Sequence, residues 1–156
     1  MRLLFAILVI TLVSACAATP GKISVTKPIT TWDAETGLGL EGYDPVAYFK
    51  EQTPVQGRAE YNQVHQGVTW RFASAEHQAA FAAAPDRYLP QYGGYCAFAI
   101  SRGTVAHGDP HQWAVVDDKL YVNNNAFAMS LWNQDRPGNI AAADENWPLY
   151  SKVPIE

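Results

Sequence analysis

The stretch GVTWRFASAEHQAAFAAA, residues 67–84, sets out a strand and then a helix. Val68, Trp70 and Phe72 alternate with smaller or polar residues, which predicts a half-buried strand with its aromatic face inward. The glycine that opens the stretch suits a tight turn, so a hairpin with a preceding strand over Tyr61 to Val64 is predicted.

The second half of this stretch predicts a helix from Ala75 to about Ala84. Ser74 is a favoured N-cap residue, and Glu76 suits the positive end of a helix. Pro85 then ends the helix, because proline disfavours a helical conformation in the residue before it.

Working outward, the chain alternates short strands and short helices without a regular βαβ rhythm, which indicates an α+β domain of small antiparallel hairpins packed with several short helices. No internal repeat or low-complexity segment is evident. The remaining predicted elements are a turn at Gly42 to Pro45, a short strand or helical turn over Val46 to Phe49, a helical turn at Asp86 to Leu89, a helix over Tyr95 to Ser101, a hairpin of Trp113 to Val116 with Lys119 to Val122, a helix over Ala126 to Trp132 broken by Pro137-Gly138, and a last helix around Ile140 to Asn146 that ends before Trp147-Pro148.

The N-terminus predicts an export signal over residues 1–15. Arg2 precedes an apolar run that is too short to span a bilayer as a helix, and small residues lead to Cys16. An apolar residue, two small residues and a cysteine in that order resemble a bacterial lipobox, which predicts lipidation of Cys16 and attachment to a membrane through that lipid. Ala17 stands where an aspartate would resemble an inner-membrane retention signal, so we expect an outer-membrane anchor facing the periplasm.

Removal of residues 1–15 leaves 141 of the 156 residues and takes away one arginine, so the formal charge changes from −4 to −5. An acidic chain without a cluster of lysine and arginine argues against nucleic acid as a partner. Residues 16–30 then predict a lipidated tether, residues 31–150 one folded domain, and residues 151–156 a C-terminal tail.

Four stretches together resemble YHS-domain proteins of the exported bacterial type. These stretches are Gly42 to Phe49, Gly67 to Ser74, Phe81 to Tyr88 and Gln91 to Ala97, and the resemblance extends over most of residues 38–149. YHS domains are small α+β modules, so the resemblance implies that fold.

The resemblance also implies a metal-binding role, because YHS modules are attached to heavy-metal transporters and some oxygenases. Where metal-associated members have cysteines, this chain has Ala47, Ala73 and His77. The soft thiolate ligands are absent, and only the histidine can still bind a metal.

The candidate metal ligands are Cys96, His77 and His65, and the expected metal is a transition metal such as copper or zinc. Each residue has a simpler explanation. Cys96 lies in apolar sequence and can be a buried, inert thiol. His65 lies at a hairpin turn, and His77 lies in a helix where a solvent-facing histidine is ordinary.

Other polar residues carry weaker signals. His107 and His111 flank Asp109, where a loop could gather both rings, although a polar surface loop explains them as well. Asp44 and Asp144 also stand beside turns, where carboxylates usually accept hydrogen bonds from backbone amides, and no acid–base pair is evident.

These observations favour a lipid-anchored, periplasm-facing binding module that is linked to a metal or to redox chemistry. An envelope interaction or small-ligand-binding protein without a metal is the alternative, since the many aromatic residues suit either a flat apolar pocket or a packed core. A thiol-dependent enzyme that uses Cys96 is the third reading.

Overall fold

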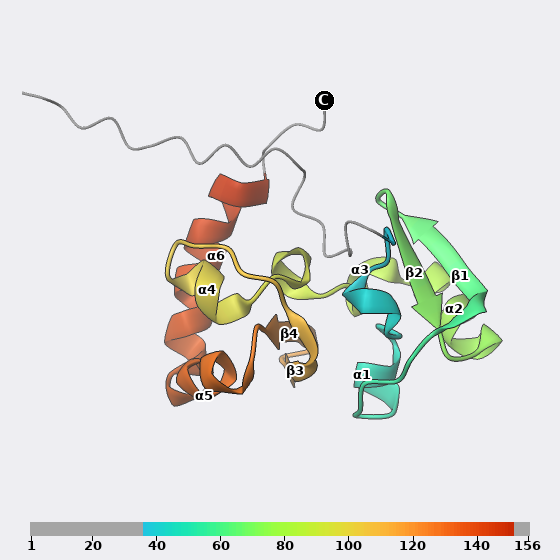
Figure 1. Ribbon diagram of the computed structural model, residues 1–156, viewed down its shortest axis with the longest axis horizontal. Coiled ribbons are helices and arrows are strands. Elements are labelled where there is room, and N and C mark those ends of the chain that lie inside the picture. The colour runs from blue at the N-terminus through green and yellow to red at the C-terminus, as the bar shows by residue number, and fades with distance from the viewer. Residues whose placement is uncertain (1–35, 152–156) are drawn as a thin grey trace, which may run out of the picture.

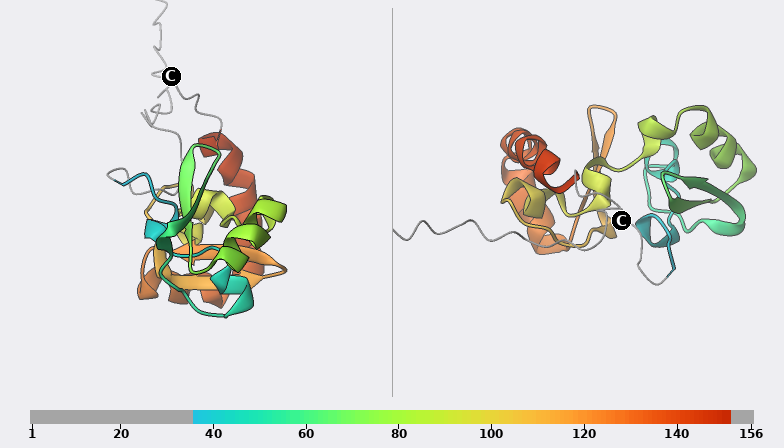
Figure 2. Two further views of the ribbon diagram at one scale, coloured as in Figure 1. Left: turned by 90° about the vertical axis from the view of Figure 1, so that its right-hand side faces the viewer. Right: turned by 90° about the horizontal axis from the view of Figure 1, so that it is seen from above.

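The structure, a computed structural model, describes residues 36–151. The chain forms two lobes that lie side by side (Figures 1 and 2). The N-terminal lobe (residues 38–84) contains η1 (Leu40–Gly42), α1 (Ala47–Lys50), β1 (Arg58–His65), β2 (Val68–Phe72) and α2 (Ala75–Ala83). After α3 (Pro85–Tyr88), the C-terminal lobe (residues 90–151) contains η2 (Gln91–Gly94), α4 (Ala97–Ser101), β3 (Asp109–Val116), β4 (Lys119–Asn123), α5 (Ala126–Gln134) and α6 (Arg136–Ser151).

The fold class is α+β, as predicted. Strands β1 and β2 form one two-stranded antiparallel sheet, and β3 and β4 form another. Val68, Trp70 and Phe72 are buried, which confirms the inward aromatic face of the strand. The N-cap at Ser74 is also confirmed, because its Oγ accepts a hydrogen bond from the backbone N–H of His77 at 3.2 Å.

Each hairpin contains an irregular segment in its first strand. In the first hairpin, Arg58 pairs with Phe72, but the next pair joins Asn62 and Arg71, so three residues of β1 are left outside the ladder. In the second hairpin, Asp109 pairs with Asn123 before Trp113 pairs with Val122. Such bulges bend a strand and redirect its side chains.

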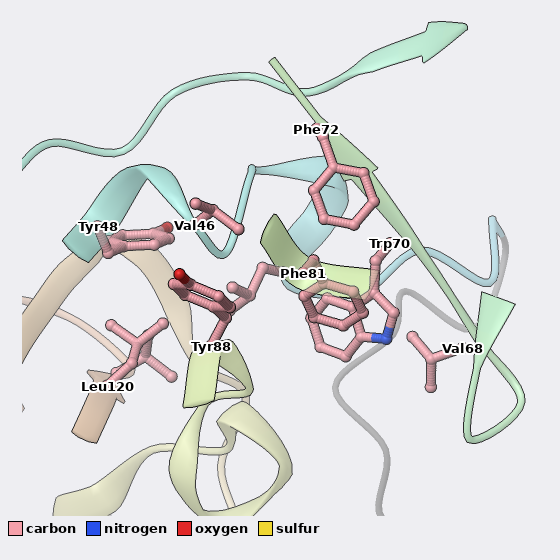
Figure 3. Packing of buried hydrophobic residues seen from close by; sticks show 10 residues of the cluster. Val46, Tyr48, Val68, Trp70, Phe72, Phe81, Tyr88 and Leu120 are labelled. Carbon is pink, nitrogen blue, oxygen red and sulfur yellow. The ribbon is translucent and has the colours of Figure 1, made fainter. Parts of the chain in front are cut away.

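Two clusters of buried apolar residues form the core. The first belongs mainly to the N-terminal lobe and consists of Leu40, Val46, Tyr48, Val68, Trp70, Phe72, Phe81, Tyr88, Leu120 and Val122. The second consists of Tyr92, Ala97, Ile100, Tyr121, Trp132, Ala143 and Tyr150. Leu120 and Val122 come from β4, so the C-terminal lobe completes the core of the N-terminal lobe, and Figure 3 shows Leu120 beside Tyr48 and Tyr88.

Two predictions from the sequence need correction or refinement. The segment over Val46 to Phe49, expected as a short strand or a helical turn, is helical, with Val46 as the N-cap residue of α1. The predicted end of the last helix before Trp147-Pro148 is wrong, because α6 continues through Pro148 to Ser151. Proline lacks only one backbone donor and disturbs mainly the preceding turn, so a position in the last turn of a long packed helix is tolerable.

The predicted signal over residues 1–15, the tether over residues 16–30 with Cys16, and all but the first residue of the tail at 151–156 lie outside the described residues. Within residues 36–151, no helix has both the length and the apolar character needed to cross a membrane.

Candidate functional site

Asp44 is the centre of a buried polar cluster in the N-terminal lobe. Its side chain is fully buried, in the turn that precedes α1. Oδ1 accepts a hydrogen bond from the backbone N–H of Val46 at 2.8 Å, and Oδ2 accepts one from the N–H of Ala73 at 2.8 Å. A buried carboxylate needs such partners, and here they fix the turn against the end of β2.

His77 completes this cluster from the first turn of α2. Its Nδ1 lies 2.6 Å from Oδ2 of Asp44, and its side chain is only 9% exposed. Asp44 already accepts hydrogen bonds from two backbone donors, so its carboxylate acts as an acceptor and Nδ1 of His77 carries the proton. In the neutral ring, Nε2 is then left with a free lone pair.

Nε2 of His77 faces a second carboxylate, that of Glu51. The distance from Nε2 to Oε1 of Glu51 is 3.7 Å, which is too long for a direct hydrogen bond. Glu51 follows the end of α1, and 44% of its side chain is exposed. Beside it, Nζ of Lys50 forms an ion pair with Oε1 of Glu76 at 2.8 Å, which also joins α1 to α2. We call Asp44, His77 and Glu51 the Asp–His–Glu cluster.

The cluster combines one residue that the sequence singled out with two that it did not. His77 is a predicted site residue. Asp44 was expected only to bond nearby backbone amides, and it does so, but the same carboxylate also binds an imidazole 33 positions away. The expectation that no acidic residue pairs with a base is therefore wrong for Asp44. The only local signal was an aspartate set among apolar residues that turn out to be buried.

The other two predicted metal ligands lie elsewhere. Cys96 is 1% exposed in the C-terminal lobe, where its Sγ accepts a hydrogen bond from the N–H of Ala99 at 3.4 Å and lies 3.6 Å from Oδ1 of Asn123. His65 ends β1 and packs edge-on against Phe81, with ring centroids 5.7 Å apart.

Cys96, His77 and His65 are therefore not brought into one site. Among residues 36–151, no three His, Cys, Asp or Glu side chains are grouped so that they could hold a metal ion by themselves. Any metal site in this part of the chain needs ligands other than His, Cys, Asp and Glu side chains to complete it, such as water.

The two histidines around Asp109 lie where the lobes meet. Nε2 of His111 is 2.9 Å from the hydroxyl of Tyr43, and Nδ1 of His107 is 3.7 Å from Oε1 of Glu41. Asp109 accepts a hydrogen bond from the backbone N–H of His111 at 2.8 Å, as expected for a carboxylate in a turn. These contacts hold the irregular segment of β3 against the N-terminal lobe.

Two buried tyrosines join separate parts of the chain. Tyr48 donates a hydrogen bond to the carbonyl oxygen of Pro110 at 3.0 Å, and Tyr92 donates one to Oδ1 of Asp144 at 2.8 Å. Burial raises the pKa of both hydroxyls above the usual range, and the nearby carboxylate of Asp144 adds to the effect at Tyr92. Both tyrosines therefore stay neutral donors in the folded protein.

Comparisons of the chain with known proteins find no matching family model and no significant match among curated proteins or solved structures. The resemblance to YHS proteins thus stays a prediction from the sequence.

Proposed function

We propose that the protein is a lipid-anchored, periplasm-facing binding module of the YHS type that takes a transition metal ion, copper or zinc, between Nε2 of His77 and the carboxylate of Glu51. The observation that carries this proposal is the 3.7 Å approach of Nε2 of His77, which is an acceptor in the neutral ring, to Oε1 of Glu51. A lone pair and a carboxylate repel each other unless a proton, a water molecule or a cation lies between them.

The buried side of His77 supports the same assignment. Metal-binding histidines almost always donate their other ring N–H to a carboxylate or carbonyl, which fixes the tautomer and the ring orientation. Asp44 provides this bond at 2.6 Å. Asp44 would orient the ligand without binding the metal, since its oxygens already accept three hydrogen bonds.

Imidazole nitrogen and carboxylate oxygen are both suitable ligands for zinc and for copper(II). With two protein ligands, water would fill the remaining positions, so the site would exchange its metal readily and keep room for a further ligand. Such a site suits transient binding in a module that receives and passes on a metal ion.

Titration of the purified protein with Zn²⁺ or Cu²⁺ tests this proposal, with Glu51→Gln as the main variant. The amide keeps the size of the side chain but loses its charge, so affinity should fall at least about tenfold, which is about 1.4 kcal/mol. Electron paramagnetic resonance of the Cu²⁺ complex should show coupling to imidazole nitrogen.

Glu76→Gln is the matched control. Glu76 is a more exposed acid in the first turn of α2, and its carboxylate pairs with Lys50. Its variant should bind metal almost as the wild type does. Equal losses in both variants would indicate only general attraction of cations by acidic side chains, and undiminished binding by Glu51→Gln would remove the proposed site.

Attachment through Cys16 is a separate part of the proposal and rests on the order Val13-Ser14-Ala15-Cys16. The mass of protein extracted from membranes should include acyl groups on a chain that begins at Cys16. An unmodified Cys16 in such an extract would contradict the anchor without affecting the metal site.

A thiol-dependent enzyme has little support from the surroundings of Cys96. Its sulfur is buried and contacts a backbone amide and an asparagine side chain. A nucleophilic thiol needs access and an adjacent base or positive charge, and Cys96 contacts neither.

A further inference from the structure

The two lobes contain the same series of elements in the same order. Each has a turn with left-handed residues, a short helix, a hairpin and a nine-residue helix. Both hairpins have an eight-residue strand, a two-residue turn and a five-residue strand. We infer that residues 38–84 and 90–135 are two copies of one structural unit, and that the second copy retains the backbone frame that holds Asp44 and His77 in the first, without the aspartate and the histidine.

The hairpins and the nine-residue helices of the two units are separated by the same number of residues. β3 begins 51 residues after β1, and α5 begins 51 residues after α2. The helices α2 and α5 have side-chain N-caps at Ser74 and Asn125, and their C-cap residues Ala84 and Asp135 share an unusual backbone conformation, with φ/ψ of −153°/68° and −148°/73°. Independent helices have no reason to agree at both ends.

The turns before the short helices also match, at a spacing of 52 residues. Leu40, Glu41 and Gly42 have φ of 48°, 54° and 84°, and Tyr92, Gly93 and Gly94 have φ of 54°, 56° and 72°. Left-handed backbone at three successive positions is rare, because it strains every residue except glycine. One residue fewer in the following loop accounts for the change of spacing from 52 to 51.

Hydrogen bonds outside the regular elements are repeated as well. The N–H of Asp44 donates to the carbonyl of Val55 at 2.9 Å, and the N–H of Cys96 donates to that of Ala106 at 2.9 Å. Parallel bridges join Leu38 to Thr69 and Pro90 to Leu120.

The core of each unit contains an equivalent aromatic pair. Trp70 and Phe81 lie 6.0 Å apart at 34°, and Tyr121 and Trp132 lie 5.5 Å apart at 39°. Each pair joins the second strand of the hairpin to the nine-residue helix, as Figure 3 shows for Trp70 and Phe81. The number of residues between the two members is the same in both pairs, so the two cores are built in the same way.

The second copy packs on the first through a face that the first copy does not use in the same way. The residues on this face differ accordingly between the copies. In the second copy, Trp113 packs on Tyr48 with ring centroids 5.1 Å apart, and Leu120 and Val122 enter the first core. The residues at the equivalent positions of the first copy are Asn62, Thr69 and Arg71, which are polar or charged.

The first copy therefore presents a polar face where the second copy presents a docking face. At the other end of the molecule, α6 covers the second copy, where Asn146 donates a hydrogen bond to the carbonyl of Ile100 at 3.0 Å and Tyr92 donates to Asp144 (Figure 1). A polar first face and a covering last helix are the end caps that repeat proteins require.

The place of Cys96 in the second copy relates this residue to the Asp–His–Glu cluster of the first copy. Cys96 stands in the second copy where Asp44 stands in the first, and Ala128 stands where His77 stands. Both Asp44 and Cys96 are buried shortly before a short helix and accept a backbone hydrogen bond from a residue that follows them, Val46 for Asp44 and Ala99 for Cys96. The thiol, like the carboxylate, accepts a local backbone hydrogen bond, and the partner imidazole is absent.

The double variant C96D/A128H tests this inference, because it should rebuild the acid–histidine pair in the second copy. Proton NMR of the wild type should show one slowly exchanging, low-field Nδ1–H signal, from His77. The folded double variant should show two signals of equal intensity, while A128H alone should show only one. This readout requires no metal, so its outcome is independent of the metal titration.

A double variant with native circular dichroism and a single signal would overturn the inference. If the variant fails to fold, an experimentally determined structure of the wild type decides the question. Residues 38–53 and 55–84 should superpose on residues 90–105 and 106–135 with the same chain direction and strand register. A different register or direction in either hairpin would overturn it.

Discussion

Replacement of Asp44 by asparagine should destabilise the protein by about 3 kcal/mol. Asp44 accepts two backbone hydrogen bonds and one from His77, on two oxygens. In asparagine one of these oxygens becomes an NH₂ group, which cannot accept. His77 can adapt by moving its proton to Nε2, but the backbone N–H of either Val46 or Ala73 then faces another donor.

The magnitude follows from this one unpaired group and from the lost charge. An unsatisfied buried donor costs about 1–3 kcal/mol, and hydrogen bonds to a charged acceptor are roughly twice as strong as neutral ones. A loss of about 3 kcal/mol is a large part of the usual 5–15 kcal/mol. With a slope of about 2 kcal/mol per M, the urea midpoint should fall by about 1.5 M.

Tryptophan fluorescence during urea unfolding measures this effect, with Asp109→Asn as the matched control. Asp109 accepts a single backbone hydrogen bond, which the asparagine oxygen can keep, so the control should change stability by less than about 0.5 kcal/mol. A loss below about 1 kcal/mol for Asp44→Asn would show that Asp44 does not hold the lobe together as argued.

Three further predictions concern other parts of the fold. Burial raises the pKa of Tyr48 and Tyr92 above the usual 10, so the stability that their neutral hydroxyls contribute is complete below about pH 10 and is lost as the pH rises. An absorbance titration should therefore show these two tyrosines ionising only on unfolding, and normal titration of every tyrosine in the native protein would contradict this. Gly57→Ala and Gly108→Ala should each cost at least about 2 kcal/mol in thermal unfolding, because the new Cβ would lie 2.6 Å from an atom of the facing strand. An unchanged Tm in either variant would refute the close approach. Cys96→Ser should stay within about 1 kcal/mol of the wild type, because serine is itself a favoured N-cap residue. The native wild-type thiol should resist a disulfide reagent until urea unfolds the protein, and rapid labelling would disprove its burial.

The local elements could be predicted from the sequence because their signals are local. Alternation at Val68, Trp70 and Phe72 marks a strand, and Ser74 marks the start of a helix. The pairing of Asp44 with His77 could not be predicted in this way, since the two residues are 33 positions apart and each has a simpler local explanation.

The repeat could not be recognised from the sequence, for a different physical reason. Few identical residues remain at equivalent positions, one of them the glycine at Gly57 and Gly108, where the backbone approach is tight, while two aromatic core positions keep their bulk and change the residue. Trp70 corresponds to Tyr121 and Phe81 to Trp132, substitutions that fill similar volumes. Polar residues occur at exposed positions. Equivalent positions of the two copies therefore differ in polarity wherever the position is covered in one copy and exposed in the other.

The insertion of Leu120 and Val122 from β4 into the core of the N-terminal lobe has a consequence for the order of folding. Leu120 and Val122 are buried in the same cluster as Val46 and Phe72. A chain that is still being synthesised cannot close its first lobe until β4 has been made, although the elements of that lobe were made long before. The aromatic side chains of the first half therefore stay incompletely covered until the second half has been synthesised.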